Sequence, residues 1–447
     1  MDFKTKQKHY NACDPNESLP PGDYRNVDFD SLDQGSGLVR GVNWVERMAT
    51  KIELAPKKDH VSCLFTGLPG SGKTTELKRL EKRLQSRDRA KLLTVFIDAT
   101  EVIDTANPIE ISDIVSSLIF RTEEEIIIKE GGDPKTILEK GSRARLWTWL
   151  KETNVNLKEI KIGGAGANLI FELKANQGLR SKVNETIQGH ILQYIQKARE
   201  EFSFLNERAR KLGHDGICII FDSLEKLRGM HSNWEQVLAS AERIFSGGAP
   251  YLKFPVHAIY TVPPALFARQ ADAIEFMPVI KIHDRNNVPY KPGIDAMREL
   301  IRRRLPDHIL NELFGVEFEA KAAKLIEWSG GYTRDLLRML HGAFLEKQFP
   351  LPDSPFLRLR NEIWDAYHRL IFTSEYEWLA RVAHKRKLVI EDDKHIQTAE
   401  RLLLNNAVLR YLNDEDWFDL HPGVLNISGV QEAFQRLKQP RNNSQGD

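Results

Sequence analysis

The sequence predicts an α/β fold: a mostly parallel sheet between layers of helices, then a helical lid and a C-terminal winged helix. Five apolar segments of strand length are separated by helical segments, a pattern typical of parallel three-layer sheets. A glycine-rich octapeptide lies between the first apolar segment and a helix-prone segment. After residue 293 the pattern is helical, until two short strands form a hairpin near the C-terminus.

Length and composition indicate an ordinary globular protein. The 447 residues suffice for two or three domains, and the chain is 41% hydrophobic and 28% charged. The net charge of +1 gives no overall attraction to nucleic acid or membranes. No apolar run approaches the roughly 20 residues that span a bilayer, and no secretory signal opens the chain. We expect a cytoplasmic protein with no membrane partner.

A phosphate-binding loop is predicted at the octapeptide, which follows the apolar run 61–65 and precedes a helix at 75–85. Glycines let backbone N–H groups approach phosphate oxygens, and the helix N-terminus adds partial positive charge. Lys73 is expected to reach the β- and γ-phosphates, and Thr74 to offer its hydroxyl to Mg²⁺. The expected nucleotide-binding positions here are Gly67, Leu68, Pro69, Gly70, Ser71, Gly72, Lys73, Thr74 and Thr75. The expected cofactors are ATP and Mg²⁺.

The first 37 residues are polar and lack a sustained period, so they are predicted to form a tail or strap over the next domain. The following domain, 38–292, begins with a short segment containing Arg40 and a helix at about 43–53. Arg40 lies just upstream of the first strand, where P-loop ATPases often contact the adenine base. A plain connector is the alternative.

The middle of the chain contains an insertion, about 100–213, that is too long for a simple crossover. It follows a strand at 92–97. Within it the pattern predicts a helix at 108–130, a β-hairpin at 157–174 and one long helix at 184–212.

The remaining strands and domains follow from similar patterns. Strands are expected at 216–221, 256–260 and 277–282. The helical lid is placed at 293–348, and the winged helix at 356–438 after a proline-rich linker. The winged helix includes a hairpin formed by 408–412 and 417–420.

A carboxylate for Mg²⁺ is predicted at Asp222, which ends the apolar strand 216–221. Hydrolysis also needs a group that orients the attacking water. In many ATPases a glutamate directly follows the aspartate, but here Ser223 takes that position. Glu225 is the nearest carboxylate; it is either the catalytic base or a solvated residue at a helix start.

Three further residues are candidates for sensing phosphate. Thr261, at the tip of the fourth strand, is either a γ-phosphate sensor or an ordinary strand-end threonine. Arg334 lies in the first turn of a lid helix, where a cation is unfavourable for the helix dipole and a phosphate partner would explain it. Arg269 is either an arginine finger for a neighbouring subunit's nucleotide or a surface residue.

With these pieces placed, the chain resembles the AAA+ and STAND branches of P-loop ATPases, over roughly residues 38–349. The resemblance rests on Gly67–Thr74, Ile217–Glu225, Tyr260–Pro263 and Gly330–Leu340, the last similar to the sensor-2 helix of origin-recognition and STAND-type ATPases. The order of elements is also similar to bacterial KAP- or NACHT-like ATP-binding proteins, in which a turn like Trp417–Pro422 closes the wing. Ser223 departs from the pattern, and such STAND-like proteins tolerate this because slow hydrolysis suits a switch.

Three functional hypotheses follow. The resemblance implies a slowly hydrolysing, ATP-dependent switch with a protein partner or nucleotide-driven self-assembly, and an output in bacterial defence or stress signalling. The alternative is an origin-recognition-like initiator or loader that binds DNA. It is disfavoured because acidic residues outnumber basic ones over 385–419. A small-molecule kinase is the third hypothesis, and no compact acceptor pocket is evident from the sequence.

Overall fold

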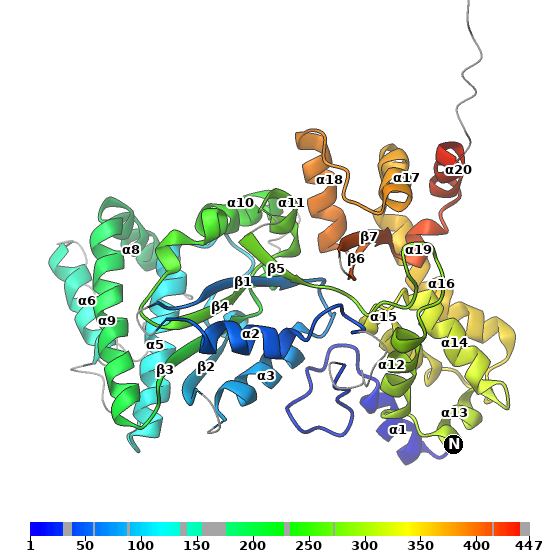
Figure 1. Cartoon of the computed structure of the whole chain (residues 1–447), viewed down its shortest axis with the longest axis horizontal. Helices are drawn as coiled ribbons and strands as arrows, with labels where there is room; N and C mark the ends of the chain where they lie inside the picture. Colours follow the sequence, from blue (N-terminus) through cyan, green and yellow to red (C-terminus); the bar gives the residue numbers. More distant parts are fainter. Residues whose placement is uncertain are drawn as a thin grey trace, which may run out of the picture. The chain divides into compact units, whose positions relative to one another are not determined.

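The computed structural model describes most of the chain (Figure 1). The described residues are 1–29, 38–56, 59–86, 90–134, 141–153, 176–227, 233–270, 273–413 and 415–438. They form two compact units. The first unit contains Met1–Trp44, Gly67–Glu76 and Phe276–Asp447, and the second contains Val45–Thr66 and Leu77–Glu275.

The predicted α/β fold class is confirmed by a five-stranded sheet with the order β2-β3-β4-β1-β5. The pairs β2·β3, β3·β4 and β4·β1 are parallel. Every residue of the interior strand β3 is buried, as expected for a strand covered on both faces. The strands are β1 Ser62–Gly67, β2 Leu92–Asp98, β3 Gly216–Asp222, β4 His257–Thr261 and β5 Ile274–Met277.

Amphipathic helices cover this sheet, and Figure 1 shows α2 (Trp44–Glu53) and α10 (Trp234–Phe245) on opposite sides of it. Helix α3 (Lys73–Leu84) buries Leu77, Leu80 and Leu84, which lie on one helical face. The short helices α4 (Ala99–Val102) and α11 (Phe267–Gln270) follow β2 and β4.

The described part of the long insertion is mainly helical, and one prediction for it is wrong. It contains α5 (Ile111–Lys129), α6 (Ser142–Thr153), α8 (Gln177–Gly189) and α9 (Ile191–Lys211). The single helix predicted at 184–212 is broken at His190, whose backbone (φ −136°, ψ 33°) is not helical. The apolar stripe continues across the break, so periodicity alone did not reveal it. The hairpin predicted at 157–174 lies outside the described residues.

The fifth strand is also displaced from its prediction: it ends at Met277, where the prediction began. Residues 278–282, which follow the strand, are buried but do not continue it. They connect separate segments of the first unit. The backbone N–H groups of Val279, Ile280 and Lys281 donate to three separate carbonyls, those of Arg410, Gly331 and Val39. An apolar run indicates burial, and here burial comes from irregular packing for most of its length.

The rest of the first unit is helical with one antiparallel hairpin, in the order predicted for a lid and a winged helix. The lid contains α12 (Lys291–Arg302), α13 (Asp307–Phe314), α14 (Phe318–Ser329) and α15 (Thr333–Ala343). The C-terminal part contains α16 (Asp353–Leu370), α17 (Tyr376–Lys385), α18 (Asp393–Leu404), β6 (Val408–Leu412), β7 (Asp416–Leu420), α19 (Pro422–Leu425) and α20 (Ser428–Lys438). No helix among the described residues has the length and apolarity needed to cross a membrane.

The N-terminal segment contains a helix that the sequence did not predict, α1 (Phe3–Ala12). It packs on the lid. The His9 ring donates from Nδ1 to the carbonyl of Arg304 at 3.0 Å, and the Tyr10 and His341 rings stack with centroids 3.6 Å apart. Only His9 and Ala12 of this helix are buried, too few apolar positions to give a periodic signal.

Gly331, just before α15, gives a test of this packing. It has a φ of +78°, and a Cβ there would overlap the carbonyl oxygen of Ile280. Gly331→Ala is expected to lower the free energy of unfolding by well over about 1 kcal/mol, because backbone strain and overlap add. The measurement is urea unfolding followed by circular dichroism.

Gly131→Ala is the matched control, since Gly131 has a φ of +79° and nothing within 4 Å of the added Cβ. The Gly131→Ala variant has the backbone strain of a positive φ, but its added Cβ does not overlap a neighbouring atom. Equal losses in both variants would contradict close packing at Gly331.

Candidate functional site

The glycine-rich loop has the backbone conformation that a phosphate-binding loop needs. Gly70 and Gly72 have φ values of +87° and +93°, which side-chain-bearing residues rarely adopt. The N–H of Ser71 donates to the carbonyl of Leu68 at 3.0 Å, and helix α3 begins at Lys73. The loop therefore leads into a helix N-terminus, where free N–H groups and the helix dipole favour an anion.

Lys73 lies inside the curve of the loop. It is only 3% exposed, and its Nζ donates to the carbonyls of Gly67 and Leu68 at 3.0 and 3.2 Å. Thr74 and Thr75 follow in the first turn of α3 and are half-buried. The loop thus keeps the Lys73 ammonium where phosphate oxygens are expected to bind.

Arg40 is buried beside the same loop. Its Nη1 forms an ion pair with Glu76 at 2.9 Å, and its Nη2 donates to the carbonyl of Ser71 at 2.8 Å. Its guanidinium also stacks over the Phe29 ring at 4.8 Å. These contacts brace the loop against the first turn of α3. The predicted contact with the nucleotide stays a prediction.

The start of lid helix α15 is bonded to the loop. The hydroxyl of Thr333 donates to the carbonyl of Gly70 at 3.1 Å, and the hydroxyl of Tyr332 donates to the carbonyl of Pro69. Arg334 lies so close to Gly70 that a Cβ there would overlap its guanidinium. The sequence analysis selected Arg334 and missed its two neighbours, although both were visible as polar residues directly before it.

Arg334 is placed to meet an anion. Its Nε is buried and has no hydrogen-bond partner among the described residues. A buried donor without an acceptor costs roughly 1–3 kcal/mol. A phosphate oxygen on the adjacent loop would supply that acceptor, which supports the interpretation of Arg334 as a phosphate-sensing residue.

The C-terminal helices contact the same lid residues. Asn406 donates from Nδ2 to the Tyr332 hydroxyl at 3.0 Å, so this hydroxyl joins Asn406 to the loop carbonyl of Pro69. The Tyr411 hydroxyl donates to the carbonyl of Gly330 at 2.6 Å. The loop, the lid and the C-terminal hairpin therefore share one chain of hydrogen bonds.

Asp335, next to Arg334, fixes helix α15 from its other side. It is 1% exposed and accepts from the Tyr367 hydroxyl at 2.8 Å, with Arg338 Nη1 at 3.0 Å and His421 Nε2 at 3.4 Å. Burial acts to raise the pKa of Asp335, but its hydrogen bonds and nearby cations outweigh burial and lower the pKa below the usual value. An ionised Asp335 therefore ties α15 to α16 and to the turn after β7.

The predicted metal and base residues lie at the carboxyl edge of the sheet, in the second unit. Asp222 ends β3, is 1% exposed and pairs in register with Asp98 of β2. Ser223 then adopts a left-handed backbone (φ 70°), and Glu225 follows in a short 3₁₀ turn. Glu225 is 6% exposed, so it is not a solvated residue, and its role as the catalytic base stays a prediction.

Thr261 holds this turn in place. Its hydroxyl accepts from the N–H of Leu224 at 3.0 Å and lies 3.4 Å from the carbonyl of Phe221, and the side chain is fully buried. The described contacts make Thr261 a positioning residue for the segment from Asp222 to Glu225. The predicted γ-phosphate contact stays a prediction.

Arg269 is a partly exposed residue of α11, paired with Glu242 at 3.6 Å. This placement fits the surface alternative, and its role as a finger stays a prediction. Among the described residues, no three His, Cys, Asp or Glu side chains cluster as metal ligands. Mg²⁺ does not require such a cluster, because it is usually held by one or two protein oxygens together with phosphates and waters.

Comparison with known proteins gives structural likeness only. No family model and no curated protein matches the sequence. A Walker-type ATPase of Pyrococcus abyssi is 12% identical, with 88% of this chain and 96% of that chain covered and a TM-score of 0.40. The Aeropyrum pernix ORC1 protein in complex with DNA is 12% identical (92% and 97% covered, TM-score 0.28). The Aeropyrum pernix ORC2 protein is 11% identical (91% and 97% covered, TM-score 0.31). At these values the likeness carries no argument about function.

Thr261 gives a test of the turn. Thr261→Val is expected to lower the free energy of unfolding by about 1–3 kcal/mol, because the buried Leu224 N–H loses its acceptor. Thr261→Ser keeps the hydroxyl and is expected to lose less. Thermal unfolding of both variants checks this, and a Val variant as stable as the Ser variant would show that the hydroxyl does not hold the turn.

Proposed function

We propose that this chain is a Mg²⁺-dependent ATP-binding protein of AAA+/STAND type, whose bound nucleotide sets the arrangement of the lid and the C-terminal helices. The observation that carries the proposal is the contact of three successive residues with one short stretch of the glycine-rich loop: Tyr332 and Thr333 donate hydrogen bonds to its carbonyls, and Arg334 lies beside Gly70. A ligand on that stretch cannot bind without acting on the start of α15.

The loop N–H groups and Lys73 would bind the phosphates, and Thr74 would offer its hydroxyl to Mg²⁺. Asp222 and Glu225 keep the roles predicted from the sequence, those of a carboxylate ligand of Mg²⁺ and of the group that orients the attacking water. Mg²⁺ neutralises phosphate charge when it is bound. Ser223 lies where many ATPases have the catalytic glutamate, so we propose slow turnover, which suits a switch.

The switch would work through Arg334. A γ-phosphate attracts its guanidinium more strongly than a diphosphate does, because it adds charge and acceptors next to Gly70. A shift of Arg334 moves Tyr332, whose hydroxyl also receives the bond from Asn406. ATP and ADP would then favour different positions of the C-terminal helices, exposing a surface for a protein partner or a second copy.

A second candidate function is an origin-recognition-like ATPase that binds DNA. Four of the eight acidic residues that disfavoured it form ion pairs with arginines within the first unit: Asp419 with Arg386, Asp416 with Arg410, Glu391 with Arg381 and Glu415 with Arg285. Arg381 and Arg285 lie outside residues 385–419, so the charge count over that range overstated the net acidity that a phosphate backbone would meet. Binding to duplex DNA that weakens steeply with salt would favour this candidate over the switch.

Two variants separate the roles of the loop and the lid. Lys73→Ala is expected to abolish binding of both ATP and ADP, while Arg334→Ala weakens ATP by about tenfold and ADP much less. Isothermal titration with Mg²⁺ measures both. Lys82→Ala, an exposed position on α3, is the control. Unchanged ATP affinity in the Lys73 variant would refute the site.

Self-assembly can be measured by mass photometry with ADP and with ATP plus Mg²⁺, beside a Glu225→Gln variant. ATP-dependent oligomers that last longer in the variant are expected, because the variant retains ATP. Arg269→Ala would then be expected to reduce turnover only in the assembled form. A monomer under every condition would rule out nucleotide-driven self-assembly and leave a protein partner as the output.

A further inference from the structure

The N-terminal segment reaches the glycine-rich loop through one aromatic ring. Phe29 is 7% exposed, and its ring covers the guanidinium of Arg40, with 4.8 Å between Cζ and the ring centroid. Arg40 in turn donates to the carbonyl of Ser71 at 2.8 Å. All three residues belong to the first unit. They form one line of contacts that ends at the backbone of the loop.

The N-terminal segment is fixed to the lid just upstream of Phe29. Arg304 donates from Nη1 to the carbonyl of Arg25 at 3.0 Å, and Arg303 donates from Nη1 to the carbonyl of Asn26. The two arginines follow helix α12, so two successive lid side chains hold two successive carbonyls of the segment. These bonds restrict the chain that presents the Phe29 ring to Arg40.

The burial of Arg40 is not explained by stability alone. Arg40 and its partner Glu76 are only 3% and 6% exposed, with 2.9 Å between Nη1 and Oε1. The cost of removing two charges from water offsets much of the attraction between them. The Nε of Arg40 is also buried and has no hydrogen-bond partner among the described residues, which adds to the cost. A side chain placed at such a cost beside the loop is better explained by what it does to the loop.

The bond from Arg40 to the Ser71 carbonyl orients a peptide of the loop. In a planar trans peptide the C=O group and the following N–H group point in opposite directions. Holding the Ser71 carbonyl toward Arg40 therefore directs the N–H of Gly72 away from Arg40. Gly72 has a φ of +93°, and a Cβ added there would lie 3.5 Å from Nη2 of Arg40. The arginine thus lies close to the peptide that it orients.

The Phe29 ring contributes an interaction that depends on its aromatic face. A guanidinium over such a face is attracted to the ring, and the attraction grows where water is excluded. An aliphatic side chain such as leucine would fill similar space without this attraction. The position of Arg40 is therefore expected to depend on the ring of Phe29 as well as on its volume.

We propose that Phe29 is a positioning residue for the phosphate-binding loop. Its ring holds Arg40, and Arg40 holds the Ser71–Gly72 peptide with the Gly72 N–H directed at a bound phosphate. The N-terminal segment is then part of the nucleotide site, although it acts through the loop backbone. The effect on nucleotide affinity rests on the proposed function, whereas the effect on the loop does not.

The first test measures the loop in the full chain without nucleotide. Hydrogen exchange followed by mass spectrometry reports the amides of Gly67–Glu76, with those of β3 as a reference for general destabilisation. Phe29→Leu is expected to raise exchange in the loop about fivefold and to leave β3 unchanged. Phe29→Tyr keeps the ring and is expected to retain the original rate.

Tyr24→Leu is the matched control, because Tyr24 lies in the same segment and is 65% exposed. It is expected to leave exchange in the loop unchanged. Equal loop exchange in Phe29→Leu and Tyr24→Leu would overturn the proposal. So would an equal rise in Phe29→Leu and Phe29→Tyr, because the aromatic face would then not matter.

The second test measures nucleotide affinity by isothermal titration with Mg²⁺. Phe29→Leu is expected to weaken ATP and ADP by a similar factor, about fivefold, because both place phosphates on the loop. In an Arg40→Gln background the same substitution is expected to change affinity less than twofold, since the ring has lost its partner. Equal losses in the two backgrounds would show that Phe29 does not act through Arg40 and would overturn the proposal.

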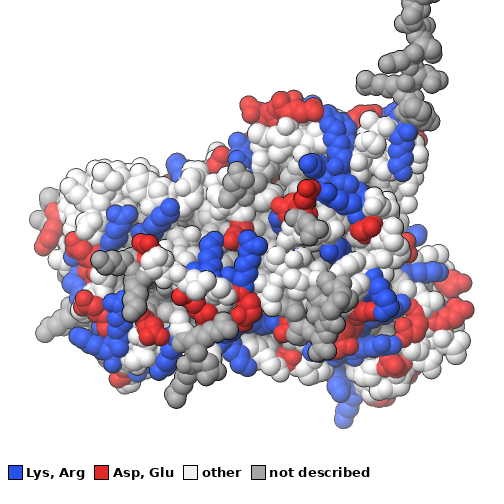
Figure 2. All heavy atoms as spheres, in the orientation of Figure 1, with Lys and Arg blue, Asp and Glu red and all other residues white. Residues whose placement is uncertain are grey.

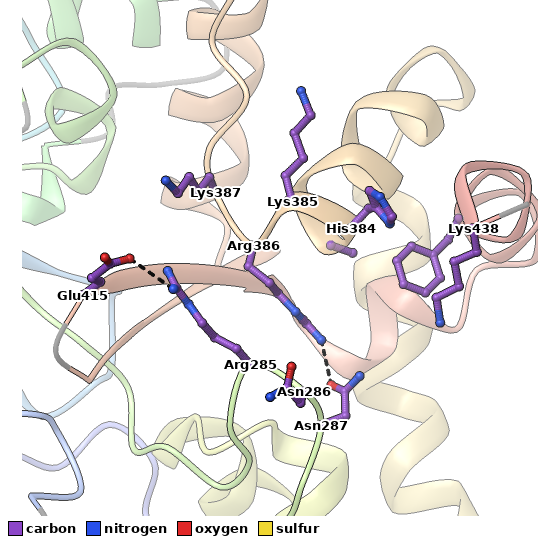
Figure 3. A pocket seen from close by; sticks show the side chains of 11 residues that line it. Arg285, Asn286, Asn287, His384, Lys385, Arg386, Lys387, Glu415 and Lys438 are labelled. Atoms are coloured by element: carbon purple, nitrogen blue, oxygen red, sulfur yellow. Dashed lines mark hydrogen bonds and ion pairs between the residues drawn. The ribbon is translucent and has the colours of Figure 1, made fainter. Parts of the chain in front are cut away.

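Binding of ATP elsewhere on the chain has to be subtracted. Figure 2 shows Lys and Arg side chains gathered over α17. In the hollow of Figure 3, the charged ends of Lys385, Lys387 and Lys438 point away from one another, so only weak, salt-sensitive binding of an anion is expected there. Titration of the Lys73→Ala variant at physiological salt measures this background.

The two tests separate this inference from the proposed function. If the unsubstituted chain binds ATP no better than the Lys73→Ala variant, the proposed function fails, and loop exchange still decides whether Phe29 positions the loop. If the unsubstituted chain binds ATP and Phe29→Leu binds it equally well, this inference fails and the proposed function stands.

Discussion

The contact between the glycine-rich loop and the start of helix α15 is the interaction on which the arrangement of the first unit depends. Two side-chain hydroxyls, from Tyr332 and Thr333, bond to consecutive loop carbonyls. Glycine at 70 is required on two counts, its positive φ and the guanidinium of Arg334 beside it. Because Gly70 has no side chain, the lid holds the loop there through its backbone carbonyls.

The residues around this contact hold α15 in register. Asp335 is buried among Tyr367, His421 and Arg338, and its lowered pKa keeps it ionised at neutral pH. A buried charge of this kind is stable only while all its partners stay in place. Any movement of Arg334 therefore reaches α16 and the turn after β7 through its immediate neighbour.

Thr261 holds a turn in place at the carboxyl edge of the sheet, as Asp335 holds helix α15 in the first unit. The turn from Asp222 to Glu225 contains a left-handed serine, a conformation that costs free energy and must be held by its surroundings. The buried hydroxyl of Thr261 contributes by accepting the Leu224 N–H. The carboxylate of Glu225 is thereby kept inside the protein, where a solvated surface glutamate had been the competing hypothesis.

The sequence by itself determined the class of fold, the glycine-rich loop before helix α3 and the strand that ends at Asp222. These features are local, because glycine positions, apolar runs of strand length and a helix start each depend on residues close together in the sequence. It also selected Arg334, because a cation in a first turn conflicts with the helix dipole. Only the tertiary structure decided where the run after Met277 leaves the sheet, that a helix lies at 3–12, and that Asn406 reaches the loop through Tyr332. It also showed that half of the acids counted against DNA binding are paired with arginines within the first unit. These outcomes depend on partners that are distant in sequence, and no local pattern records them.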